Sequence, residues 1–226
     1  MGNFSIEQAS TFADDIDLVI LVITIIVGIW WVATESLFLG FILKFRESKV
    51  ERAMYITGEK KEHMKWINLP HGLVLACDVI VIVFAVRVWY NVKQDLPEPD
   101  RVVRITGQQW TWSFQHPGPD NRLDTEDDIR TVDDLYIELG KTYHFELVAK
   151  DVMHSFSVPA FRLKQDLVPG RTIKGWFQTT MTGDFDLQCA EMCGIGHGIM
   201  AAKVHVIDSP DYAKWVADNS EHPEHP

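Results

Sequence analysis

Cysteine is scarce in this chain. Among 226 residues only Cys77, Cys189 and Cys193 occur, too few for a disulfide framework. Basic residues are also in deficit, with 21 Lys and Arg against 32 Asp and Glu and a formal charge of −11. This balance excludes a protein organised around phosphate contacts, so we expect no nucleic-acid partner. Neither an internal repeat nor a Cys-x-x-Cys-His haem-attachment sequence is present.

Charged residues are nearly absent from two long stretches. Residues 18–43 hold one charge, Glu35, and as a helix of about 1.5 Å per residue they exceed the roughly 30 Å hydrocarbon core of a bilayer. Residues 66–90 form a second apolar stretch, aromatic at both ends and interrupted by Asp78 and Arg87. We expect two membrane spans. Residues 1–17 carry acids and no Lys or Arg, unlike a secretory signal.

The loop between these stretches, residues 44–65, contains seven Lys and Arg residues. Short basic loops face the cytoplasm, so residues 1–17 and everything after residue 90 are predicted to lie outside. A linker at 91–100 then leads to a domain at 101–208 and to a terminal helix and tail at 209–226. Glu35 and Asp78 are expected to face a larger membrane partner, with proton handling as the alternative, because a carboxylate exposed to lipid is costly.

The external part has the pattern of an all-β domain. Short segments rich in β-branched and aromatic residues, separated by Gly, Pro and Asp turns, occupy residues 102–114, 135–139, 143–149, 172–179, 184–188 and 200–207. This spacing predicts a sandwich or barrel. Ser209 and Pro210 then start one helix, and residues 222–226 are expected to form a disordered tail. From residue 91 onward 13 basic residues face 22 acids, which favours a basic partner.

A short loop concentrates metal-binding side chains. Cys189, Cys193, His197 and Met200 lie within twelve residues, and His154 precedes them. Zinc could use two Cys and two His, and a disulfide could join the cysteines in an oxidising compartment. The thioether favours copper, and the second thiolate is one too many for a mononuclear blue-copper site. The preferred interpretation is therefore a copper pair bridged by both cysteines, with one His on each metal.

Four motifs occur in order along the chain: Gly107-Gln-Gln-Trp-Thr-Trp, Asp151-Val-Met-His-Ser, Leu163-Lys-Gln-Asp-Leu-Val-Pro-Gly-Arg and the cysteine loop. Together they resemble subunit II of A-type haem-copper cytochrome c oxidases over nearly the whole chain. The resemblance implies a two-helix transmembrane hairpin followed by a cupredoxin-like Greek-key sandwich that carries the binuclear Cu-A centre. The implied copper ligands are His154, Cys189, the Glu191 carbonyl, Cys193, His197 and Met200.

The same resemblance implies further roles. The Glu191 side chain would reach a possible magnesium ion shared with subunit I, and Trp110 would receive electrons from cytochrome c. Asp166 and Arg171 would lie near the subunit I interface. The alternatives are a sandwich aromatic for Trp110 and a charged turn pair for Asp166 and Arg171. The expected location is the bacterial plasma membrane, with the copper domain on the periplasmic side.

The chain departs from the family pattern at three points. His63, beside Glu62, stands where the family commonly has a glutamate at the mouth of a proton path, so these two residues are the candidates for that entrance. Lys150 replaces an acidic docking residue of some relatives, whereas residues 120–128 add five acids against one arginine. This acidic insert is therefore the predicted docking surface. Since no haem is attached to the chain, the donor is expected to be another protein.

The predicted function is electron input to a respiratory terminal oxidase, with oxygen reduced to water in subunit I. The alternative function is that of the Cu-A subunit of a nitric oxide reductase. Only the active site of the partner subunit would distinguish the two functions. A quinol oxidase subunit would lack the ligands. A copper store would need exchangeable ligands rather than a rigid loop anchored to a membrane.

Overall fold

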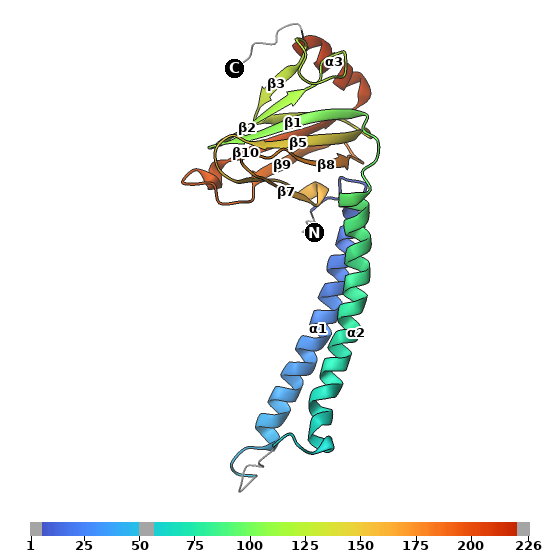
Figure 1. Cartoon of the computed structure of the whole chain (residues 1–226), viewed down its shortest axis with the longest axis vertical. Helices are drawn as coiled ribbons and strands as arrows, with labels where there is room; N and C mark the ends of the chain where they lie inside the picture. Colours follow the sequence, from blue (N-terminus) through green and yellow to red (C-terminus); the bar gives the residue numbers. More distant parts are fainter. Residues whose placement is uncertain (1–5, 50–56, 221–226) are drawn as a thin grey trace, which may run out of the picture. The chain divides into compact units, whose positions relative to one another are not determined.

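The computed structural model describes residues 6–49 and 57–220 (Figure 1). Among these residues there are two compact units: those between 15 and 90 form a helical unit, and residues 6–14 group with residues 91–220 in a sandwich unit. Residues 222–226, predicted to be disordered, and part of the basic loop lie outside the described residues.

Two helices make up most of the helical unit. Helix α1 runs over Ala13–Lys44 and α2 over Lys61–Trp89, and α2 continues as the π-helix η1, Tyr90–Gln94. Both are long and apolar enough to cross a membrane. Each helix begins five residues before its predicted apolar stretch. In α1 the added residues include Asp14, Asp15 and Asp17, whose charges are favourable near the positive end of the helix dipole.

The sandwich consists of two five-stranded sheets, ordered β3-β2-β1-β5-β8 and β4-β10-β9-β6-β7. The strands are β1 Arg101–Gln108, β2 Thr111–His116, β3 Ile129–Val132, β4 Asp134–Glu138, β5 Thr142–Ala149, β6 His154–Val158, β7 Leu163–Leu167, β8 Ile173–Gln178, β9 Gly183–Cys189 and β10 Ala201–Ile207. Helix α3, Ser209–Ser220, buries Tyr212 and Val216 beside Ile129. The predicted fold class, two apolar helices, a β-sandwich and a C-terminal helix, is confirmed.

Alternation of apolar and polar residues places the core between the sheets. In β1 the side chains of Val103 and Ile105 are buried while their neighbours are at least partly exposed, as a period of two requires. The predicted segment 102–114 turns at Gln109 and Trp110 and becomes the antiparallel pair β1 and β2. Strands β3, β6 and β7 were not predicted, because they are short and polar residues interrupt them.

An N-terminal strap, residues 6–13, is attached to the sandwich. The Ala9 amide donates to the Ala160 carbonyl over 2.8 Å, and the Ala9 carbonyl accepts from the Thr180 amide over 3.1 Å. Phe12 is buried, with its ring edge-to-face against Trp176 at 5.4 Å. The strap is therefore part of the sandwich unit.

The acidic insert, residues 120–128, is folded against the middle of β1 and β2. Asp124 forms an ion pair of 2.6 Å with Arg104 of β1. Asp128 is buried and accepts hydrogen bonds from the Gln115 side chain and the Asp124 amide. Asp127 accepts from Thr125. These carboxylates hold the insert in place and are only partly available to a partner.

A histidine bridges two carboxylates on the outer face of the second sheet. His205 lies 2.8 Å from Asp134 and 2.7 Å from Asp184, one through each ring nitrogen, and stacks on Tyr136. Partial burial lowers the pKa of His205, but the two hydrogen bonds outweigh it, and the pKa is raised above its usual value. The charged form is thus favoured by folding.

Candidate metal centre

The cysteine loop, residues 190–200, joins β9 to β10 and projects from one end of the sandwich (orange in Figure 1). Its base is closed by the Cys189 amide, which donates to the Met200 carbonyl over 3.0 Å. The Ala190 amide donates to the Ser155 carbonyl, also over 3.0 Å, and thereby ties the loop to β6. Strand pairing therefore places Cys189, Met200 and the start of β6 side by side.

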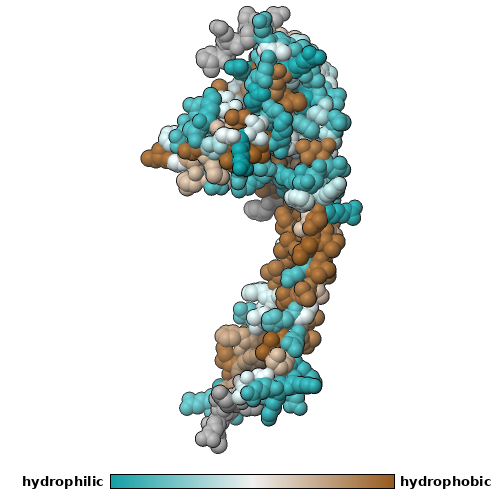
Figure 2. Space-filling model, viewed as in Figure 1, coloured by the Kyte–Doolittle hydropathy of each residue, from teal (hydrophilic) through white to brown (hydrophobic). Residues whose placement is uncertain are grey.

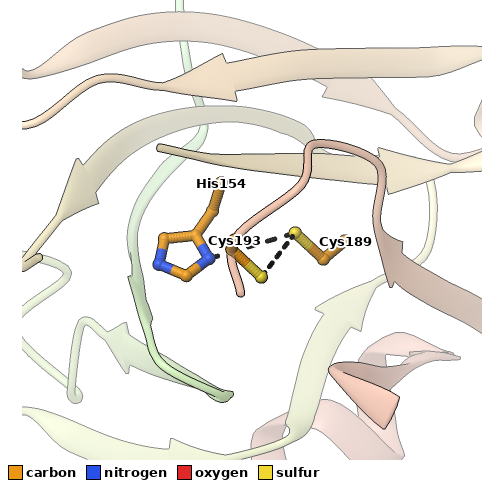
Figure 3. A group of neighbouring side chains, drawn as sticks. All are labelled: His154, Cys189 and Cys193. Carbon is orange, nitrogen blue, oxygen red and sulfur yellow. Dashed lines mark hydrogen bonds between the residues drawn. The ribbon is translucent and has the colours of Figure 1, made fainter. Parts of the chain in front are cut away.

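The two thiols lie at the middle of the cluster. Their sulfurs are 3.8 Å apart, both cysteines are free, and both are buried. The Nδ1 atom of His154 lies 3.9 Å from the Cys189 sulfur. Figure 3 shows these three side chains converging on a common point, and their ligand atoms all lie within 4.8 Å of one another.

Three further donors complete the cluster. The Cys189 thiol contacts the Glu191 carbonyl at 3.2 Å. The Cys193 sulfur lies 3.6 Å from Nδ1 of His197 and 3.8 Å from the Met200 sulfur. Each thiol thus has one imidazole and one weaker donor beside it, and the thiols contact each other.

This donor set fits a copper pair. Six donors are more than a four-coordinate zinc site uses, and the four donors other than the thiols divide evenly between the two sulfurs, as a site for two metal ions would require. Sulfur and imidazole ligands with a thioether match the preference of copper. Burial, with a further contribution from Cys189, raises the pKa of Cys193 to about 11, so this thiol is neutral at neutral pH until a metal displaces its proton.

Asp151 orients His154 and was missed as a functional residue from sequence. Its carboxylate lies 2.8 Å from Nε2 of His154 and also accepts from the Gln109 and Val152 amides, both over 2.7 Å. Partial burial raises the pKa of Asp151, but these hydrogen bonds outweigh it and lower the pKa. The ionised carboxylate therefore holds Nε2, so that Nδ1 faces the thiols. The three-residue spacing of Asp151 and His154 was the available signal.

Trp110 covers the cysteine loop from the β1–β2 turn. Its indole N–H donates to the Cys193 carbonyl over 3.2 Å, and the Gln109 side chain donates to the same oxygen over 2.8 Å. The ring lies directly over Gly196, where an added Cβ would come within 2.4 Å of it. Trp110 is 37% exposed, so one side chain connects the surface to the backbone of a candidate ligand.

The other predicted residues lie outside the cluster. Asp166 on β7 accepts from Ser155 over 2.7 Å, beside His154 on the neighbouring strand, while Arg171 lies in an exposed turn after β7. Glu62 and His63 lie in the first turn of α2 and belong to the helical unit.

Comparisons with known proteins agree on one family. Residues 101–207 match the family described as "Cytochrome C oxidase subunit II, periplasmic domain". The chain is 33% identical over 204 residues to an alternative cytochrome c oxidase subunit 2 of Bradyrhizobium diazoefficiens, covering 80% of this chain and 72% of that protein. It is 29% identical over 224 residues to cytochrome c oxidase subunit 2 of Cereibacter sphaeroides, covering 86% and 72%.

A solved structure supports the same assignment. The crystal structure of the periplasmic domain of subunit II of cytochrome oxidase from Bradyrhizobium japonicum superposes with a TM-score of 0.52 at 26% identity. It covers 57% of this chain and 100% of its own. The chain belongs to the cytochrome c oxidase subunit II family, and hence to the subunits of an oxidoreductase complex.

Proposed function

We propose that this chain is the electron-input subunit of a respiratory terminal oxidase and that its cysteine loop holds a binuclear Cu-A centre. The ligands are His154, Cys189, the Glu191 carbonyl, Cys193, His197 and Met200. The observation that carries the proposal is that two thiols lie in contact and that each has one imidazole and one weaker donor beside it. A copper pair bound there supplies the uptake and release of one electron without the making or breaking of bonds.

The protein's own residues keep this site rigid. Asp151 fixes the His154 ring, and the backbone bond between Cys189 and Met200 closes the base of the loop. Trp110 and Gln109 both bond to the Cys193 carbonyl, so the candidate ligand loop is held from the side that faces solvent. Because the loop is held on several sides, its ligands move little when the site gains or loses an electron. The reorganisation energy therefore stays low, which favours fast electron transfer.

Partners follow from the family and from the geometry. We propose that a c-type cytochrome delivers electrons at Trp110 and that the haem-copper subunit I receives them. The Glu191 side chain is then a candidate ligand for magnesium shared with subunit I, and Asp166 and Arg171 are candidates for that interface. Helices α1 and α2 anchor the chain in the bacterial plasma membrane, with the sandwich on the periplasmic side. Glu62 and His63 remain candidates for a proton-path entrance.

Copper analysis of the complex that holds the full chain tests the proposal. We expect about two coppers per chain in addition to the copper of subunit I, with one unpaired electron shared equally by the two nuclei in the electron spin resonance spectrum. Cys193→Ser should abolish that signal. Cys77→Ser, which removes the third cysteine from α2, is the matched control and should leave it unchanged. Copper in no excess over that of subunit I, or hyperfine coupling to a single copper, would refute the assignment.

A further inference from the structure

The large exposed hydrophobic side chains of the sandwich gather at one end. Over residues 91–220 they are Trp110, Val132, Val152, Met153, Met192, Ile195 and Ile199. They lie in the β1–β2 turn, the β5–β6 loop, the cysteine loop and the end of β3 next to Trp112. Figure 2 shows the tip of this end as an apolar projection. Large apolar side chains exposed together at one end of a domain mark an interaction site.

Four of these side chains come from the Trp110 turn and from the two loops that contact it, and we call them the apolar patch: Trp110, Val152, Met153 and Ile195. Ile195 is 95% exposed and sits between Gly194 and Gly196, both of which lie against the Trp110 ring. Val152 and Met153 follow Asp151, whose carboxylate accepts a hydrogen bond from the backbone amide of Gln109, the residue before Trp110. The patch therefore includes the side chain that bonds to the Cys193 carbonyl, Trp110.

Charge is sparse around this patch. The loops at residues 108–111, 150–153 and 190–199 carry Lys150 against Asp151 and Glu191. The turn after β3 adds Asp133, whose carboxylate accepts from the Thr111 hydroxyl and the Trp112 amide. The Asp151 carboxylate is already engaged by His154 and by two backbone amides. This end of the sandwich thus offers no ring of free acids to a basic partner, although residues 91–226 carry a formal charge of −9.

The acidic insert lies elsewhere on the domain. Asp124 pairs with Arg104, and Asn121 bonds to Asp100, so the insert borders the start and middle of β1. Gln109, at the far end of that strand, is roughly 17 Å further along than Arg104 at about 3.3 Å per residue. An electron-donor protein centred on Trp110 would therefore reach the acidic insert only at the margin of the docking interface.

The geometry points to an electron donor that docks by apolar contact, with Ile195 as the central anchor. The inference rests on the proposed function and narrows its partner: a c-type cytochrome whose haem edge is framed by apolar side chains rather than by lysines. Ile195 presents nearly all of its surface to such a partner. Covering it next to Trp110 brings the donor to the side chain that contacts the ligand loop. Because surface charges contribute little, salt has little effect on association.

The test measures reduction of the copper centre by stopped flow in the oxidase complex that holds the full chain. Three reductants are compared: a c-type cytochrome with an apolar haem rim, one with a lysine-ringed haem edge, and hexaammineruthenium(II), which needs no docking surface. We expect the apolar donor's rate to change less than about twofold between about 0.02 and 0.2 M salt. Ile195→Ser should lower that second-order rate about tenfold and leave the ruthenium rate and the copper spectrum unchanged.

Two controls separate the explanations. Ile6→Ser removes an isoleucine that is 57% exposed on the strap and should have no effect on any rate. The double variant Asp120→Asn with Glu126→Gln lowers the charge of the insert and should also leave the apolar donor's rate unchanged. The docking inference is overturned, and the proposed function is not, if the rate of copper reduction by cytochrome falls steeply with salt, falls in the insert variant and does not respond to Ile195→Ser. Reduction by ruthenium but by neither cytochrome overturns the donor class in the proposed function as well.

Discussion

Gly196 provides a test of the contact between Trp110 and the cysteine loop. An ideal Cβ at Gly196 would lie 2.4, 2.6 and 2.8 Å from three atoms of the Trp110 ring, whereas ordinary contacts begin at 3.4 Å. Gly196→Ala therefore forces a displacement of about 1 Å. Gly196 has φ −89°, so the backbone itself accepts alanine without strain. The effect of the substitution is steric.

The magnitude follows from the two ways in which the overlap can be relieved. Trp110 can leave the surface altogether, which exposes roughly 150 Å² of ring at ~25 cal/mol per Å² and breaks one hydrogen bond, a cost of about 5 kcal/mol. It can instead shift in place, for which overpacking typically costs about 1–3 kcal/mol. The smaller cost wins. The ring should stay on the loop with its 3.2 Å bond to the Cys193 carbonyl lengthened or broken.

Gly198→Ala is the matched control, because an added Cβ at Gly198 would meet nothing within 4 Å. Urea unfolding of the two variants, with copper content and the rate of copper reduction by a c-type cytochrome, decides the question. We expect Gly196→Ala to lose about 1–3 kcal/mol in the free energy of unfolding and to transfer electrons more slowly while keeping its copper. Equal stability and equal rates in both variants would refute the contact. Copper loss in Gly196→Ala would show that the ligands, not Trp110, had moved.

Three further predictions concern other parts of the chain. Met200→Leu should shift the potential and spectrum of the copper centre with metal retained, whereas Cys193→Ser should lose the pair; equal copper loss in both would contradict a weak axial role for Met200. The pKa of His205 is raised by folding, so protonated His205 stabilises the folded protein, by at most about 1 kcal/mol at this partly exposed site. This stabilisation is fully present below about pH 6.5 and is lost as the pH rises through the folded-state pKa. Urea titrations at acid and alkaline pH should therefore show that His205→Gln destabilises the protein more at acid pH, and a deficit independent of pH would contradict this. Phe12→Ala should destabilise the sandwich unit by about 3 kcal/mol and expose the strap to protease, and unchanged thermal unfolding would show that the strap contributes nothing.

The sequence was informative wherever a signal is local. Two apolar stretches of span length predicted α1 and α2, because helix length and hydropathy are properties of consecutive residues. Ser209 and Pro210 predicted the start of α3 in the same way. The cysteine loop brings most of its candidate ligands together by chain continuity alone, so its metal chemistry could be inferred from spacing.

Contacts between distant segments had to come from the tertiary structure. Trp110 and Cys193 are separated by 83 residues, and only the β1–β2 turn and the β9–β10 loop at one end of the sandwich bring them together. The insert looked like a free acidic surface because its composition does not reveal that Arg104 is paired with it.

Amino-acid types and local spacing by themselves determined the two apolar helices, the fold class and the donor atoms offered to a metal. Strand pairing between residues far apart in the chain decided which side chains support those donors, which acids are neutralised and which apolar residues surround Trp110. The physical reason is that strand register and sheet packing set these distances, and neither is encoded in any short stretch of sequence.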